Sequence, residues 1–206
     1  MSRRLYQNET LETIARKVIS QYDPGLLQSP APIPVEEIME KVYGLTLDFQ
    51  YLCKSGQVLG ETIFEDSVIP VYERRTGEGY KLIHVNAGTV LIDADLACKY
   101  DDGRLRFTCA HELAHWVIDK NYFMQPGEPA IAPEVAKAVR SSETDEAVER
   151  QANRMASRIL MPKCTIKKAF CQIRAYAQNI IADLADLYRV SRLAMEIRLN
   201  EMGLEF

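Results

Sequence analysis

The chain has 206 residues, 47% of them hydrophobic, which is enough to bury a sizeable core in one domain or in a domain with an appendage. Its net charge is −4, so no overall positive field attracts nucleic acid or an anionic membrane, and neither is expected as a direct partner. The first residues lack the apolar stretch of a signal peptide. The sequence also contains no run of about 18 apolar residues, the length that could span a bilayer. Five cysteines without a C-x-x-C pair are typical of reduced thiols, so we expect a cytoplasmic protein.

The first half of the chain predicts two helices and three strands. Apolar residues spaced at i, i+3, i+4 and i+7 predict an amphipathic helix from about Leu11 to the Asp23-Pro24-Gly25 turn. A short helix is expected over residues 35–43, closed by Gly44. Residues 45–51 alternate apolar and polar and predict a half-buried strand. Residues 67–75 and 80–87 flank a TGEG turn and predict a hairpin, in which Pro70 favours an edge position or a bulge.

The second half is predicted to be helical. A helix is expected over residues 103–119, where the apolar period changes to 3.6. Residues 121–134 contain three prolines and a glycine, which predicts a functional loop such as a lid between two helices. A further helix is expected over residues 143–160, and Arg150, Arg154 and Arg158 form an i, i+4 ladder on it that is interpreted as a solvent face. The remainder, about 165–202, is predicted to be helical with breaks near Gln178 and Ser191.

Residues 111–115 read His-Glu-Leu-Ala-His, a pattern that suits a zinc hydrolase. Four residues on a helix correspond to about one turn, so His111 and His115 can share a metal ion. Glu112 is close enough to reach a water molecule at that metal without being a ligand. The alternative is a pair of surface histidines on an ordinary amphipathic helix. Cys109 precedes His111 by two residues, about 200° around the helix, and is expected to point away into the core.

A catalytic zinc normally takes three protein ligands, so a third is expected outside the motif. The acidic residues of the 143–160 helix are the natural source, and Glu149 is the favoured ligand, with Glu146 as its main rival. Small Ala152 and Ala156 would allow this helix to approach the histidines closely. Asn153, one turn after Glu149, could accept a ring N–H from a ligand histidine and fix its tautomer. The alternative for Glu149 is an ordinary surface ion pair with an arginine. Glu143 and Asp145 complete the set of acidic candidates.

Three segments together resemble the ImmA/IrrE metallopeptidase family. They are RFTCAHELAHWVI (106–118), ERQANRMASRILMP (149–162) and the helical tail LADLYRVSRLAMEIRLNEMGL (184–204). The likeness covers most of the chain, including the stretch PVEEIMEKVYGLTL near its start. Departures are modest: Met155 stands where phenylalanine is usual, Gln151 where glutamate is frequent, and Ala114 where glycine is frequent. The loop between the first two motifs is also long.

The resemblance implies a cytoplasmic zinc-dependent endopeptidase, with manganese as a possible substitute metal. By the match, His111, His115 and Glu149 correspond to the metal ligands and Glu112 to the catalytic base. The implied fold is α+β and zincin-like, with a short antiparallel sheet packed on helices in residues 1–162 and a helical, helix-turn-helix-like subdomain in residues 163–206. The implied substrate is a protein partner, a repressor that carries a helix-turn-helix. By analogy, that peptide would run as an extra strand along the sheet edge.

Two other function classes are kept open. The C-terminal helices have the rhythm of a DNA-binding helix-turn-helix, with Ser191 as a plausible N-cap, but their net charge is only +2 from Lys163 onward, which argues weakly against DNA. A metal sensor that regulates without proteolysis is the third class. The group that would stabilise the oxyanion is not identified: His84 and Tyr122 are candidates, and each is more simply interpreted as an ordinary structural residue.

Overall fold

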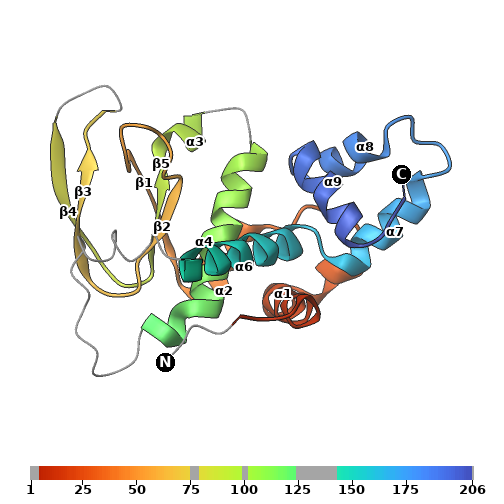
Figure 1. The fold of residues 1–206 in the computed structure, drawn as a ribbon, viewed down its shortest axis with the longest axis horizontal. Helices are drawn as coiled ribbons and strands as arrows, with labels where there is room; N and C mark the ends of the chain where they lie inside the picture. The colour runs from red at the N-terminus through yellow and green to blue at the C-terminus, as the bar shows by residue number, and fades with distance from the viewer. Residues whose placement is uncertain (1–4, 75–78, 99–101, 124–142, 206) are drawn as a thin grey trace.

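A computed structural model describes residues 5–74, 79–98, 102–123 and 143–205, of which 98, 121–123 and 143–145 are described for the backbone alone. The β3–β4 hairpin lies at one end of the molecule and helices α7, α8 and α9 at the other, with α4 and α6 crossing between them (Figure 1). The elements are α1 (Asn8–Tyr22), a 3-10 turn η1 (Pro24–Leu27), α2 (Val35–Tyr43), β1 (Thr46–Gln50), β2 (Gly60–Thr62), β3 (Ser67–Tyr72), β4 (Tyr80–Val85), β5 (Thr89–Asp93), α3 (Ala94–Cys98), α4 (Asp102–Phe123), α6 (Glu143–Leu160), α7 (Lys163–Ile173), α8 (Ile180–Tyr188) and α9 (Arg192–Glu201).

The strands form a three-stranded sheet and a separate hairpin. In the larger sheet the order is β1-β5-β2, with β1 parallel and β2 antiparallel to β5. The continuous apolar run of β5, which includes Val90, Leu91 and Ile92, is buried, as a central strand requires. The hairpin pairs Ser67 with Val85 through Tyr72 with Tyr80, and Pro70 is accommodated because both strands are edges. The predicted α+β class is therefore confirmed, and the sheet is mixed, since β1 and β5 pair in parallel.

The helices follow most of the predicted order and boundaries, and the short α3 after β5 was not predicted. Gly44 ends α2 in the left-handed conformation at φ 65°, which glycine adopts without strain. The Ser191 hydroxyl accepts from the backbone N–H of Ala194 and caps α9, as predicted. Helix α4 continues to Phe123, beyond the predicted end near residue 119. Most of the predicted lid loop, its residues 124–134, lies outside the described part of the chain.

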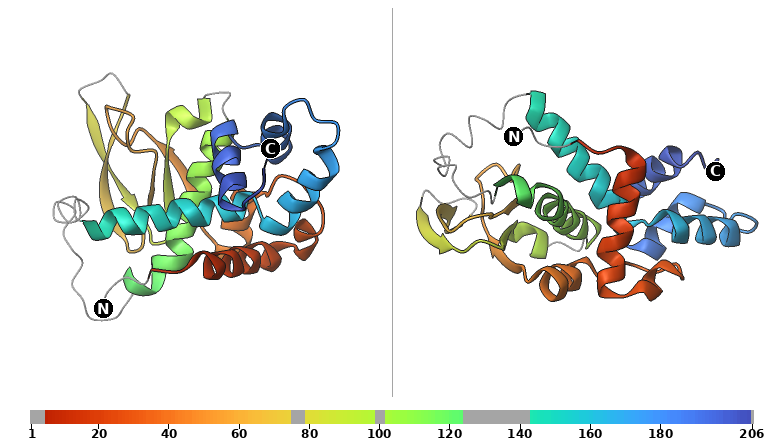
Figure 2. Two further views of the ribbon diagram at one scale, coloured as in Figure 1. Left: turned by 45° about the vertical axis from the view of Figure 1, so that its right-hand side comes forward. Right: turned by 90° about the horizontal axis from the view of Figure 1, so that it is seen from below.

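One continuous hydrophobic core joins the N-terminal helices, the sheet and the C-terminal helices. It includes Leu11 of α1, Ile92 of β5, Met155 of α6 and Leu199 of α9. Helix α1 packs against α6, beside the C-terminal helices (Figure 2). In the described part of the chain, no helix combines the length and apolar character needed to cross a bilayer.

The expectation that the arginine ladder of the 143–160 helix faces solvent is wrong for its last member. Arg150 is exposed, but the Arg158 side chain is 2% exposed. Its guanidinium forms ion pairs with Glu12 of α1 and Glu201 of α9, at 3.4 and 3.3 Å. The spacing of arginines along one helix does not reveal carboxylates that come from distant helices, and here those carboxylates compensate a buried charge.

Candidate metal centre

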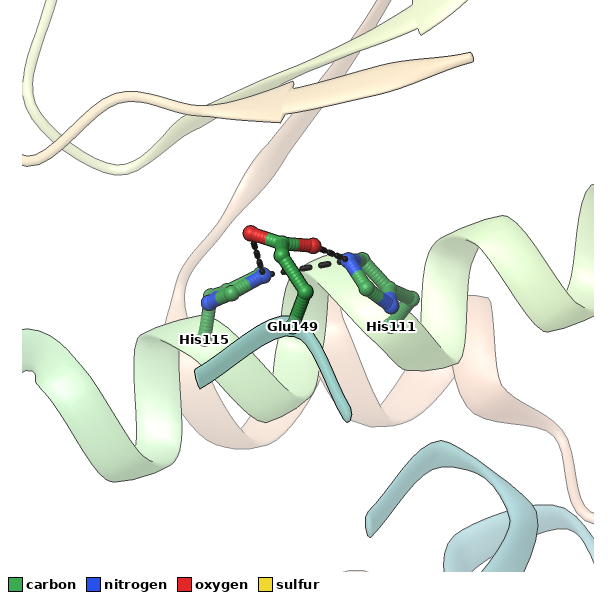
Figure 3. Close-up of side chains that lie close together, drawn as sticks. All are labelled: His111, His115 and Glu149. Atoms are coloured by element: carbon green, nitrogen blue, oxygen red, sulfur yellow. Dashed lines mark hydrogen bonds and ion pairs between the residues drawn. The ribbon is translucent and has the colours of Figure 1, made fainter. Parts of the chain in front are cut away.

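Helix α4 places the two histidines of the motif on one face. His111 and His115 are one turn apart, and their rings meet edge to face with centroids separated by 4.7 Å. Helix α6 crosses this face, and the buried small side chains of Ala152 and Ala156 permit a close approach of the two helices. The same crossing brings Glu149, one turn before Ala152, over the two imidazoles (Figure 3).

The three side chains converge on one point. The Nε2 atoms of His111 and His115 are 3.0 Å apart. The Glu149 carboxylate reaches them with Oε2 at 3.2 Å from His111 Nε2 and Oε1 at 3.5 Å from His115 Nε2. In Figure 3 the imidazoles from α4 and the carboxylate from α6 point toward one another. One ligand atom from each lies within 4.8 Å of the others, an arrangement that could hold a metal ion.

The spacing of these donor atoms fits a tetrahedral zinc site. Ligand bonds of about 2.0 to 2.1 Å at tetrahedral angles separate the donor atoms by about 3.3 Å. The two Nε2 atoms are 3.0 Å apart, and each Nε2 lies 3.2 or 3.5 Å from the carboxylate oxygen nearer to it, values on both sides of that separation. Two imidazoles and one carboxylate are also a ligand set used by catalytic zinc sites, which leave a fourth position open. The residues present therefore fit zinc in both chemistry and spacing.

The outer nitrogens of both histidines are held by acceptors. His111 Nδ1 lies 3.0 Å from Asn153 Oδ1, the type of contact predicted from the spacing of α6, and His115 Nδ1 lies 2.9 Å from Asp119 Oδ2. Because both oxygens can only accept, each Nδ1 carries the proton and donates it. Both Nε2 lone pairs then face each other and Glu149. Three converging electron-pair donors require a cation between them, either a proton or a metal ion.

The pKa values of His115 and Glu149 also indicate that the cluster of His111, His115 and Glu149 favours a bound positive charge. Burial by itself would lower the pKa of His115, but hydrogen bonds with Asp119 and Glu149 and the charge of Glu112 raise it to about 10. Hydrogen bonds from His111 and His115 hold the pKa of Glu149 far below its usual value, against the opposing effect of partial burial. The cluster therefore binds a proton strongly in the absence of a metal.

Glu112 points from α4 toward strand β2. Its residue is only 5% exposed, and Oε2 accepts a 2.7 Å hydrogen bond from the Thr62 hydroxyl. Burial raises the pKa of Glu112, while the charges of His115 and His111 and the hydrogen bond from Thr62 oppose that increase. A carboxylate that is more basic than usual, next to the cluster and outside its ligand set, is suited to proton transfer.

The other predicted candidates lie away from the cluster or are not described. Glu146, the rival third ligand, pairs instead with Arg150 at 3.0 Å on the exposed side of α6. His84 is exposed on β4, opposite Val68. Cys109 is fully buried, and burial raises its pKa, so the thiol is neutral and turned into the core. The side chains of Tyr122, Glu143 and Asp145 are outside the described set.

Two residues of the site were not predicted from the sequence. Asp119 lies one turn after His115 on the same helix, so its i, i+4 spacing could have identified it as a partner for the ring. Thr62 belongs to a three-residue strand that has no periodic signal of its own. Only the pairing of β2 with β5 brings its hydroxyl to Glu112, and no local pattern could have revealed that contact.

Comparison with known proteins adds a family to this geometry. A peptidase family model described as the IrrE N-terminal-like domain matches residues 69–200, an interval that contains α4 and α6. No curated protein matches the chain significantly. Among solved structures, a Mycobacterium tuberculosis transcriptional regulator is similar with a TM-score of 0.49 and 17% identity, over 94% of this chain and 48% of that one. The chain thus spans about half the length of that regulator.

Proposed function

Because the chain belongs to the peptidase family whose model is the IrrE N-terminal-like domain, we propose that it is a metal-dependent endopeptidase acting on a protein partner. The observation that carries this proposal is the convergence of His111, His115 and Glu149 beside the buried carboxylate of Glu112. We propose the first three as ligands of zinc, or of manganese in its place. The cytoplasmic location stays a prediction.

Each residue would have a distinct part in peptide hydrolysis. Bound zinc would supply Lewis-acid chemistry, which lowers the pKa of water and polarises a carbonyl group. Glu112 would accept the proton of the attacking water and later deliver it to the leaving amine. Asn153 and Asp119 would keep both histidines in the tautomer that presents Nε2. The cleaved bond would thus gain one hydroxyl on its carbonyl carbon and one proton on its nitrogen.

The proposed substrate is an extended segment of a helix-turn-helix repressor, as the ImmA/IrrE resemblance implies. Strand β2 is an edge of the β1-β5-β2 sheet and contacts α4 beside Glu112. An extended peptide could pair with this edge, since strand addition supplies backbone hydrogen bonds with little demand on sequence. This placement supports an endopeptidase that reads a flexible segment of its partner.

The second candidate is a protein-binding regulator that uses the C-terminal helices without proteolysis. Helix α9 exposes Leu193 and Ile197, at 65% and 51%, on one side. Arg189, a side chain that a DNA reader would direct at phosphates, forms a 2.6 Å ion pair with Asp102 of α4. Exposed apolar residues on α9, the second helix of the α8–α9 pair, suit a protein partner better than DNA. This alternative also treats residues 163–206 as a docking subdomain.

The first test is metal content by mass spectrometry after reconstitution with zinc. About one zinc per chain is expected for the wild type and for Glu146→Ala, whose side chain pairs with Arg150. His115→Ala and Glu149→Ala should lose most of the metal. If Glu149→Ala retained zinc like the wild type, the third ligand would be wrong. If the wild type bound no metal, the peptidase proposal would fail.

The second test separates the peptidase from the metal sensor. Glu112→Gln should retain zinc and partner docking but abolish cleavage, because the amide cannot accept the proton of water. Protein N-termini are compared by mass spectrometry in cells that express the wild type or the variant. New N-termini confined to the wild type support proteolysis and identify the substrate. Regulation that persists in Glu112→Gln and fails in His115→Ala would support a sensor instead.

A further inference from the structure

Strand β2 makes a close contact with the side chain of Glu112. The Thr62 hydroxyl lies 2.7 Å from Glu112 Oε2 and 3.1 Å from the backbone oxygen of the same residue. A hydroxyl has one proton to donate, and the shorter contact to a charged acceptor is the stronger of the two. Since Glu112 is 5% exposed, water has little access to replace this bond. The carboxylate therefore has one oxygen fixed by a neighbouring element.

Gly60, at the start of the same strand, leaves just enough room for the other side of the carboxylate. A Cβ atom at position 60 would lie 2.7 Å from Glu112 Oε1, 2.9 Å from Glu112 Cγ and 2.9 Å from Thr108 Cγ2. Such distances are shorter than real Cβ contacts, so any side chain here would force Glu112, Thr108 or the strand itself to shift. Gly60 does not have a positive φ, unlike Gly44 or Gly88. The glycine is needed for this close approach and not for an unusual backbone angle.

These contacts restrict the rotation of the carboxylate. Oε2 is occupied by the Thr62 hydroxyl, and Oε1 lies 2.7 Å from the position that a Cβ atom at residue 60 would take. A general base works only when its accepting oxygen is held in a defined direction, because small errors in placement cost much of the rate. The strand that carries both residues is also the sheet edge beside the cluster. The orientation of Glu112 is thus set by β2 as well as by its own helix.

We propose that Thr62 and Gly60 are positioning residues, which hold the Glu112 carboxylate in the orientation required for proton transfer. This proposal rests on the proposed peptidase function. A purely structural role is the alternative, in which the hydroxyl only satisfies a buried carboxylate. The two roles predict different losses when the hydroxyl is removed. In a positioning role, zinc binding stays intact and only the properties that depend on the orientation of Glu112 change.

The test measures acetohydroxamate binding to the zinc-loaded protein by calorimetry, so no substrate is needed. The acid form of this chelator binds a metal through two oxygens and passes its hydroxyl proton to a nearby base, so its affinity reports the placement of Glu112. Thr62→Val, which keeps the shape and removes the hydroxyl, should bind it about tenfold more weakly. Thr62→Ser, which restores the hydroxyl, should bind like the wild type. Thr46→Val, at the opposite edge of the same sheet, is the matched control and should not change.

A double-mutant cycle shows whether Thr62 acts through Glu112. Glu112→Gln alone should weaken acetohydroxamate binding, and adding Thr62→Val to it should have little further effect. Gly60→Ala should also weaken binding with zinc retained, whereas Gly79→Ala, whose added carbon would meet only the flexible Glu73 side chain at 3.3 Å, should not.

Four outcomes would overturn the inference. Thr62→Val binding like the wild type, Thr62→Ser binding as weakly as Thr62→Val, or full additivity with Glu112→Gln each contradict a positioning role. Loss of zinc from Thr62→Val would assign the hydroxyl a structural role instead. A wild type that binds neither zinc nor acetohydroxamate would overturn the proposed function itself, which distinguishes that failure from the failure of this inference.

Discussion

Asp119 controls how His115 presents its metal-facing nitrogen. Its carboxylate is buried, accepts from Nδ1 at 2.9 Å, and leaves Nε2 as the ring nitrogen that faces the cluster. Acceptors of this kind orient a ligand histidine and increase its basicity. Without the carboxylate, the ring can rotate or change tautomer, and Nε2 is no longer held in place. Asp119 is therefore expected to affect the metal although it does not touch it.

Asp119→Ala should weaken zinc affinity by about 10- to 100-fold, the usual effect of removing such a partner. The measurement is competition for zinc with a chromophoric chelator, with folding checked by circular dichroism. Asp183→Ala, an exposed carboxylate on α8, is the control and should leave zinc affinity unchanged. An affinity for Asp119→Ala equal to that of the wild type would show that α4 packing alone orients the ring.

Zinc binding should release about one proton per chain at pH 7 to 8, because a metal ligand must be deprotonated. In the metal-free protein the pKa of His115 is raised from its ordinary value of 6.5 to about 10, so this ring is protonated near neutrality. Because this pKa is higher in the folded than in the unfolded chain, protonation of the ring stabilises the metal-free fold. The contribution is complete below about pH 6.5 and is lost as the pH rises through about 10. Calorimetry of zinc binding in buffers with different ionisation enthalpies counts the protons. No proton release at pH 7 would contradict the shifted pKa.

At the scale of elements, helices α1 and α6 were predictable because their apolar residues repeat over several turns. The motif of α4 and the breaks on either side of α8 are also local signals. Strands β2 and β5 were missed for different reasons. β5 is buried on both faces and does not alternate, whereas β2 has three residues and is defined only by its partner. Their pairing positions Thr62, so this part of the site depends on tertiary contacts.

The choice of Glu149 over Glu146 depended on the spacing of residues along α6. Both carboxylates lie near the start of this helix, so their place in the chain alone does not separate them. Small Ala152 and Ala156 mark the face that approaches α4, and this pattern supports Glu149. The third member of the arginine ladder was misplaced because its partners, Glu12 and Glu201, belong to other helices. The spacing of residues along a helix thus predicts which face packs against a neighbour better than it predicts which distant residues contact its other faces.

The close crossing of α4 and α6 leads us to expect that a larger side chain at Ala152, which is buried between them, is poorly tolerated. Ala152→Leu should decrease the free energy of unfolding by about 1 to 3 kcal/mol, because the added carbons have no space. It should also weaken zinc binding by moving Glu149 away from the histidines. Both are measured on one preparation, by urea denaturation and chelator competition. Ala175→Leu, at an exposed position after α7, is the control, and a stable variant with normal zinc affinity would contradict tight packing here.

At the scale of the whole molecule, a buried ion cluster joins the two ends of the chain. Glu12 of α1 accepts ion pairs from Arg158 of α6 at 3.4 Å and from Arg198 of α9 at 2.7 Å. Arg198 also donates to the backbone oxygen of Met161, at the end of α6. The hydrophobic core is continuous across the same helices. The division at residue 162 stays a prediction, and a C-terminal part joined in this way is better described as a subdomain than as an independent unit.

Glu12→Gln should therefore destabilise the whole chain and not only its first helix. Removing the charge leaves two nearly inaccessible guanidinium groups, each 1 to 2% exposed, with Glu201 as their remaining carboxylate partner among the described residues. Breaking a buried pair in this way costs about 3 kcal/mol of unfolding free energy. Guanidinium denaturation, followed by circular dichroism and by Trp116 fluorescence, should show one coincident transition at a lower midpoint. Glu9→Gln, exposed on the same helix, should change the free energy of unfolding by less than about 0.5 kcal/mol. Two separate transitions would show instead that residues 163–206 unfold independently of the metal centre, and that the ion cluster does not couple them.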